Sequence, residues 1–128
     1  MKFLEAFLLS VITIFAPLKM VVITTLVMVV ADLLTGILAA RKQGIPITSS
    51  GIKRTIAKLV LYEVALLLAY LCEIYLLAGY LPASKLVSAL IGITELKSVL
   101  ENLDTMNGSS LFSTLVKKLI SSEQDKLK

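Results

Sequence analysis

The chain has no histidine, no tryptophan and a single cysteine, Cys72, among its 128 residues. Without histidine the usual ligand sets of catalytic transition metals are missing, so we expect no metal and no cofactor. One cysteine cannot form a disulfide within the chain, and no histidine is present to activate it as a nucleophile. We therefore expect Cys72 to be an apolar packing residue, and we expect the protein not to be an enzyme.

Charge is also scarce. Charged residues make up 17% of the chain, whereas hydrophobic residues make up 57% and the mean hydropathy is +0.90. This composition is too apolar for an ordinary soluble domain. It predicts an all-α integral membrane protein with three to four transmembrane or amphipathic helices and a short amphipathic, polar C-terminal tail. We expect a membrane-embedded domain over residues 1–106, with helices at about 3–18, 20–40, 56–81 and 84–106, and a tail over 107–128.

The first and fourth segments differ from the two between them. Residues 3–18 superficially resemble a signal peptide, but the run meets Pro17 and Lys19 instead of a cleavage site, so we expect a retained segment. Residues 84–106 place apolar residues at helical spacing, with charged residues on other faces. Such a helix either crosses the bilayer inside an oligomer or lies at the interface. Charge bias favours four crossings, whereas hydropathy alone favours two or three.

A basic stretch follows the second segment. It carries five positive charges within eighteen residues and no acid: Arg41, Lys42, Lys53, Arg54 and Lys58. Positive charges concentrate on the cytoplasmic side of membrane proteins, so we expect residues 41–58 to form a cytoplasmic loop. The stretch has no glycine–lysine phosphate cradle and no aromatic platform. Contact with anionic lipid is therefore expected here, and nucleic acid is not.

One acid, Asp32, lies within the otherwise nearly apolar run of residues 20–40. An ionisable group at that depth costs about 2.5–3.5 kcal/mol on insertion scales, so it normally faces protein or water. Small residues lie beside it and would let another helix approach closely: Thr35, Gly36, Ala39 and Ala40. Asp32 is then either a polar contact between helices or subunits, or a structural aspartate bonded to Thr35 or another hydroxyl. The sequence leaves both interpretations open.

Two further acids, Glu63 and Glu73, lie ten residues apart on the third segment, close to one helical face. Together with Asp32 they would line a polar, aqueous path once several subunits assemble. In the alternative interpretation, Glu63 extends towards the Lys58 end of its helix and Glu73 towards the outer surface.

Two motifs in a fixed order resemble the phage lysis and toxin-secretion holin family over roughly residues 26–119. The first is Asp32-x-x-Thr35-Gly36-x-x-Ala39-Ala40, followed by a polar loop with Ser49 and Ser50 and an apolar helix from near Lys58. The second is Glu95-x-x-Ser98-x-x-Glu101-Asn102, followed by Gly108. Two departures are Lys97 inside the second motif and the lack of a proline soon after Ser109.

The resemblance implies a multi-pass protein of the bacterial cytoplasmic (inner) membrane that forms a homo-oligomer in the lipid bilayer. Such a protein opens lesions or pores that release an endolysin or a toxin and so causes host cell lysis. It is paired in function with that cell-wall hydrolase or toxin, without necessarily touching it. Two alternatives from other classes are an accessory membrane subunit that docks a partner, and a selective channel or export pore.

Overall fold

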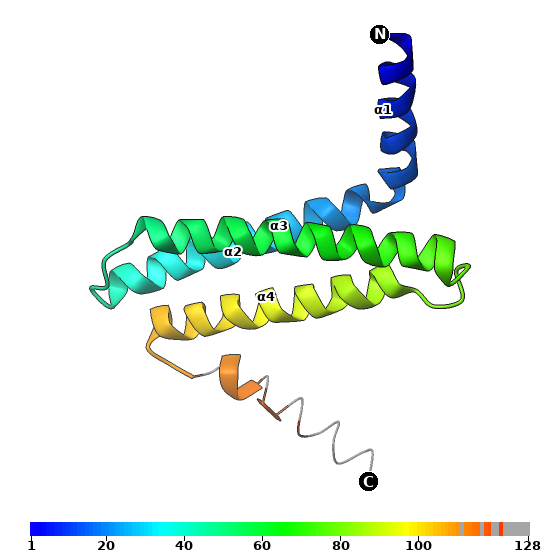
Figure 1. Cartoon of the computed structure of the whole chain (residues 1–128). Coiled ribbons are helices and arrows are strands. Elements are labelled where there is room, and N and C mark those ends of the chain that lie inside the picture. The colour runs from blue at the N-terminus through cyan, green and yellow to red at the C-terminus, as the bar shows by residue number, and fades with distance from the viewer. Residues whose placement is uncertain (111, 116, 119–120, 122–128) are drawn as a thin grey trace.

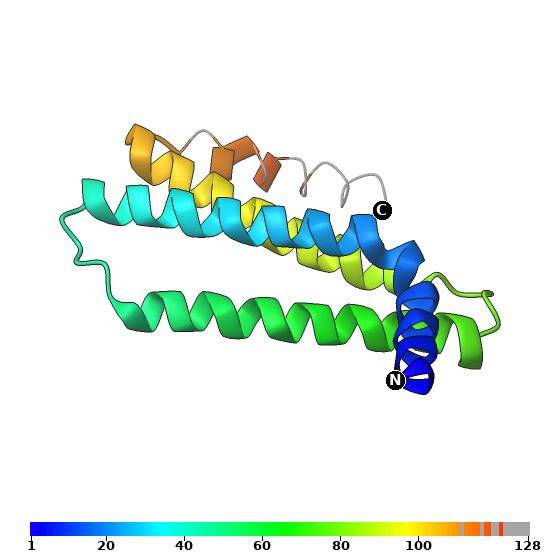
Figure 2. The same cartoon turned by 90° about the horizontal axis from the view of Figure 1, so that it is seen from above.

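The computed structural model describes residues 1–110, 112–115, 117–118 and 121. The described residues form helices and no strand, so the expected all-α class is confirmed. The elements are α1 (Lys2–Phe15), a 3-10 turn (Ala16–Leu18), α2 (Lys19–Lys42), α3 (Ser49–Leu71), a π-helical turn (Cys72–Leu76) and α4 (Ala83–Asn107). Helices α2, α3 and α4 run side by side along one axis, each antiparallel to the one before it, and α1 points away from them (Figures 1 and 2).

The change of direction between α1 and α2 coincides with Pro17. Proline has no backbone N–H to donate, so a regular helix is interrupted there. Helix α1 has no buried residue. Its contact with the bundle includes the ring of Phe15, whose centroid lies 6.2 Å from that of Tyr70 on α3. The N-terminal segment is thus a separate arm that starts at one end of the bundle.

Helix α3 begins at Ser49, which corrects the expected start at residue 56. The link between α2 and α3 is consequently short, and Lys53, Arg54 and Lys58 lie on the helix instead of in a loop over 41–58. Pro46 and the extended backbone of Thr48 (φ −110°, ψ 150°) keep the preceding residues out of the helix. Basic residues are compatible with a helix, so a charged stretch marks a membrane boundary better than it marks a helix boundary.

Both ends of helix α4 follow their local sequence closely. The helix starts directly after Pro82, and its C-cap is Gly108, which adopts the left-handed conformation (φ 67°) common at helix C-termini. A helical stretch follows at residues 112–115. Much of the expected tail pattern falls outside the described residues, namely Leu111, Val116, Leu119, Ile120 and residues 122–128.

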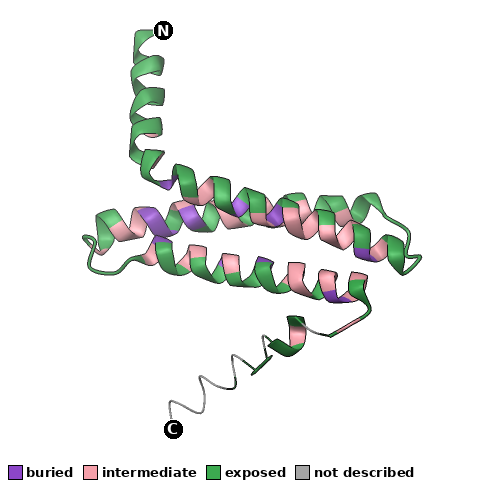
Figure 3. Cartoon of the chain, turned by 180° about the vertical axis from the view of Figure 1, so that it is seen from behind, coloured by how far each residue is buried: buried purple, intermediate pink, exposed green. Residues whose placement is uncertain are grey.

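The bundle encloses polar as well as apolar residues and exposes many large apolar ones. Figure 3 shows that the buried residues lie where the helices face one another and that most of the surface of α1 is exposed. Val29 and Leu66 are fully enclosed, but so is Glu95 on α4, which is 0% exposed. The outward surfaces of α3 and α4 carry large apolar residues, including Leu61, Leu68, Leu90 and Ile93. Two helical stretches of the described chain, Lys2–Lys42 and Ser49–Leu76, are long and apolar enough to cross a membrane. The distribution of polarity suits a molecule surrounded by lipid.

Candidate functional site

Six polar side chains meet where α2, α3 and α4 face one another. We call this group the three-helix network. Each helix contributes two members: Asp32 and Thr35 from α2, Lys58 and Tyr62 from α3, and Glu95 and Asn102 from α4. Members of the same helix are three, four or seven residues apart, so they share one helical face. The network therefore links the whole bundle through side chains that its three helices turn inwards.

Lys58 is the cation of the network. Its Nζ lies 2.7 Å from Asp32 Oδ2 and 2.8 Å from Glu95 Oε2, so it donates to both carboxylates at once. Glu95 is enclosed, and the side chain of Lys58 is 29% exposed. Burial of a charge is tolerated when it is paired and hydrogen-bonded. One lysine thus serves two acids, and α3 holds both of its neighbours through a single nitrogen.

The remaining carboxylate oxygens also have donors. Tyr62 Oη donates to Glu95 Oε1 at 2.8 Å. Asn102 Nδ2 lies 3.1 Å from Asp32 Oδ1 and 3.1 Å from Thr35 Oγ1, and the Thr35 hydroxyl itself donates to the carbonyl of Ala31. Each oxygen of the two acids therefore accepts a hydrogen bond inside one subunit, and the network is complete without a second copy of the chain.

The small residues of α2 lie beside this network. A Cβ added to Gly36 would meet Asn102 Nδ2 at 3.5 Å, which is an ordinary contact distance. Ala39 on the same helix is buried. Small side chains let helix backbones approach one another in a membrane, and here the approach is between α2 and α4 of the same chain.

The structure does not bring Glu63 or Glu73 to Asp32. Both carboxylate oxygens of Glu63 are buried, and neither has a hydrogen-bond partner among the described residues. Glu73 accepts a hydrogen bond from the backbone N–H of Ser84 at 2.9 Å and another from its hydroxyl, at the start of α4. Within one subunit the three acids therefore occupy three separate places instead of a common path.

The motif of the fourth segment divides between two faces of α4. Glu95 and Asn102 point into the network. Glu101 forms an exposed ion pair with Lys97 at 3.7 Å, and Ser98 is half-buried. Sequence analysis missed Tyr62 and treated Lys58 as a topological charge only. Lys58 and Tyr62 are four residues apart and so share a helical face, and the stretch that begins at Lys58 is largely apolar; this pattern is the available signal.

Asp104 is a second buried acid of α4, outside the network. It accepts hydrogen bonds from the backbone N–H groups of Phe112 (2.9 Å) and Ser113 (2.7 Å), and so joins the tail to the bundle. Burial alone would raise the pKa of this carboxyl, but the N–H donors of Ser113 and Phe112 outweigh it and lower the pKa. Nearby, Lys42 Nζ donates to the carbonyl of Met106, which joins the C-terminal ends of α2 and α4.

An apolar helical bundle with an enclosed ionic network defines a small integral membrane protein. The sequence model of the bacteriophage holin family matches residues 10–123, and the chain belongs to that family. The resemblance drawn from its two motifs is thereby confirmed. No curated protein and no solved structure matches the chain.

Proposed function

We propose that the protein is a holin that self-associates in the bacterial cytoplasmic membrane and opens lesions through which a cell-wall hydrolase or a toxin leaves the cell. The observation that carries the proposal is the three-helix network, enclosed in an apolar bundle, in a chain of the holin family. A single subunit pairs the charges of this network with one another between its helices. The same charges would become a water-facing surface when the helices separate.

The opening step follows from the contacts of α4. This helix contributes Glu95 and Asn102 to the network, and its outward surface carries Leu90 and Ile93. Separation of α4 from α2 and α3 exposes Asp32 and Lys58 to whatever lies between the helices. Water or the polar face of another subunit can replace the lost partners, whereas lipid cannot. Assembly of many subunits then favours the opened form, because it supplies those partners.

The direction of the helices supports a topology of three crossings. Helices α2, α3 and α4 share an axis, so the link between α2 and α3 and the C-terminal end of α4 lie at the same end of the bundle (Figure 1). That end carries Arg41, Lys42 and Lys53 and is assigned to the cytoplasm. Helix α1 joins the bundle at the opposite end and projects away from it at a steep angle to its axis, with Lys2, Glu5 and Thr13 on one face. We place it along the outer membrane surface as an interfacial helix.

Expression in bacteria tests the proposal. A holin stops growth abruptly after a delay, collapses the membrane potential, and lyses the cells when a cell-wall hydrolase is produced with it. Cells that keep their potential and exclude dyes would overturn the proposal and favour an accessory subunit. A graded, ion-selective conductance from the first moments would favour a channel.

A matched pair of variants connects this test to the network. Lys58→Met removes the shared cation and is expected to bring the onset of lysis forward, because α4 is held less firmly. Lys53→Met, on the same helix but with its side chain exposed, is expected to keep the wild-type onset. Membrane fractionation establishes that both variants insert. An unchanged onset in the inserted Lys58→Met variant would separate the network from lesion opening.

A further inference from the structure

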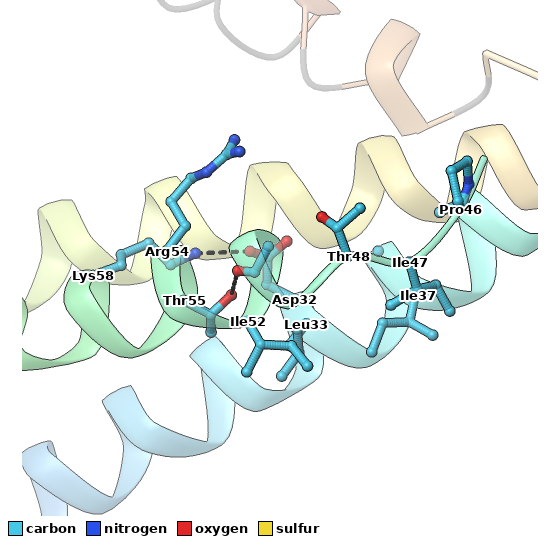
Figure 4. Close-up of a pocket in the computed structure, with 13 residues that line it drawn as sticks. Asp32, Leu33, Ile37, Pro46, Ile47, Thr48, Ile52, Arg54, Thr55 and Lys58 are labelled. Atoms are coloured by element: carbon cyan, nitrogen blue, oxygen red, sulfur yellow. Dashed lines mark hydrogen bonds and ion pairs between the residues drawn. The ribbon is translucent and has the colours of Figure 1, made fainter.

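A hollow of about 370 Å³ lies between α2, α3 and the link that joins them. Its walls are largely apolar, and Figure 4 shows Leu33 of α2 and Ile52 of α3 side by side, with Ile37 and Ile47 nearer the link. The volume falls within the range of small-ligand sites, which is about 300–1,000 Å³. The three-helix network closes one end of the hollow, since Asp32 and Lys58 are among its lining residues.

The mouth of the hollow is positively charged. Arg54 lines it and forms no ion pair with any described residue, and its guanidinium extends outwards from α3 (Figure 4). Lys58 is already paired with two acids, so Arg54 is the lining cation left for a ligand. Arg41 and Lys53 add charge at the same end. The first turn of α3 has no side-chain cap, so the positive end of its helix dipole faces the same region.

Two chemistries are therefore combined: a basic mouth with a guanidinium that suits phosphate oxygens, and an apolar interior that suits hydrocarbon. Thr48 and Thr55 add hydroxyl groups to the lining of the hollow. In the proposed topology the hollow lies near the cytoplasmic surface, where phospholipid headgroups meet the upper parts of their acyl chains, and Leu33 lies farther from the link than the other apolar side chains of the lining.

We propose that this hollow binds an anionic phospholipid, with the phosphate at Arg54 and the upper part of an acyl chain against Leu33, Ile37 and Ile52. The inference rests on the membrane orientation proposed above, but not on lesion formation. A zwitterionic lipid has the same phosphate and chains, but its cationic headgroup meets the basic residues around the mouth. Charge complementarity therefore selects the anionic lipid.

Binding is measured on the purified full-length protein after removal of lipid by detergent exchange, with retained lipid counted by native mass spectrometry. Phosphatidylglycerol is compared with phosphatidylcholine of the same chains, and glycerol phosphate serves as a water-soluble phosphate without chains. We expect phosphatidylglycerol to be retained about tenfold more strongly than phosphatidylcholine, because only the choline headgroup places a cation beside the basic residues, at a cost of about 1 kcal/mol per basic residue. We expect glycerol phosphate not to compete at equal concentration.

Two variants address the site itself, each with a control. Nothing lies within 4 Å of a Cβ built on Gly51, a lining residue, so Gly51→Leu is expected to fill the hollow without displacing its neighbours. Gly92→Leu on α4 is the control, because Gly92 has equal space and borders a different hollow. Arg54→Gln tests the phosphate contact, and its control is Lys85→Gln, an exposed lysine at the opposite end of the bundle and outside the lining.

The expected result is loss of phosphatidylglycerol retention in Gly51→Leu and Arg54→Gln but not in the two controls. Equal retention of both lipids by the wild type, or wild-type retention by Gly51→Leu, would overturn the proposal. Competition by glycerol phosphate would also overturn the lipid proposal and would indicate that the hollow binds a water-soluble phosphate compound. The lipid measurement requires no lysis, so failure of the proposed holin activity and failure of this site are seen in separate experiments.

Discussion

At the scale of single residues, the charge count of the three-helix network decides how its members respond to substitution. Lys58→Met leaves the Asp32 and Glu95 carboxylates facing each other without a cation. We expect a loss of about 2–3 kcal/mol in the free energy of unfolding, below the range for a fully buried pair, because the Lys58 side chain is 29% exposed. Asp32→Asn instead leaves one cation with one anion and is expected to cost less than about 1 kcal/mol.

Unfolding of the purified protein in detergent micelles, titrated with a denaturing detergent, compares the two variants. Equal losses for Lys58→Met and Asp32→Asn would show that the charge count is not what stabilises the packing. Asp32→Asn also keeps a side chain able to bond to Asn102, so its small cost would isolate the effect of charge from that of hydrogen bonding.

Glu63 gives a prediction of the opposite sign. Its carboxylate oxygens are buried and lack partners among the described residues. A buried polar group without a partner destabilises a fold by about 1–3 kcal/mol, so Glu63→Leu is expected to raise the free energy of unfolding by an amount in that range. Glu95→Leu makes the same chemical change at a residue with two partners and is expected to lower it. The same denaturation assay measures both, and a less stable Glu63→Leu protein would reveal an unrecognised partner.

The sequence marked Asp32 as a group that needs a polar environment, because one acid in an apolar run is costly wherever it lies. It did not indicate that Lys58 and Asn102 would supply that environment. They lie 26 and 70 positions from Asp32 along the chain, and their meeting with it depends on the rotation and sliding of α3 and α4 against α2. Periodicity defines which face of a helix is polar, but not which residue of the next helix faces it.

At the scale of elements, helix-breaking proline and glycine residues located the helix ends better than hydropathy did. Pro17, Pro82 and Gly108 lie at or near helix ends because each changes the hydrogen bonds or backbone angles available there. The start of α3 was predicted seven residues late, since its first turns are charged and hydropathy is insensitive to a polar helix. Helix α4 seemed the least suited to the membrane, but its Glu95 and Asn102 are turned towards α2 and α3.

The junction between α4 and the tail predicts a response to pH. The lowered pKa of Asp104 reflects a carboxylate that is stabilised by the N–H groups of Phe112 and Ser113. Its contribution is fully present above the ordinary pKa of an aspartate and is lost as the pH falls through the lowered value. Acidification through that range is therefore expected to release the tail from α4.

Amide hydrogen exchange at Phe112 and Ser113 reports on this release. After correction for the intrinsic pH dependence of exchange, their protection should fall with the pH in the wild type. In Asp104→Ala it should be low at every pH. Glu101→Gln, an exposed acid one turn earlier, should behave as the wild type. Constant protection down to pH 2 would show that other contacts hold the tail.

At the scale of the whole molecule, the proposed topology assigns four exposed positions to two sides of the membrane. In a Cys72→Ser background, single cysteines replace Lys2, Gln43, Tyr80 and Ser110, which are all exposed. A membrane-impermeant maleimide should label positions 43 and 110 only from the cytoplasmic side, and positions 2 and 80 only from outside. Labelling of position 2 from the cytoplasm would mean that α1 crosses as well, which gives four crossings.

The ion pair between Asp32 and Lys58 also has a consequence for the synthesis of the protein and its insertion into the membrane. Ribosomes deliver α2 and α3 before α4, so both residues of this pair are available while Glu95 is still unmade. Paired, they present the nascent hairpin to the bilayer without net charge at that depth. Glu95 then arrives with a cation already in place. If Asp32 and Glu95 were both synthesised before Lys58, they would have no counter-ion during insertion.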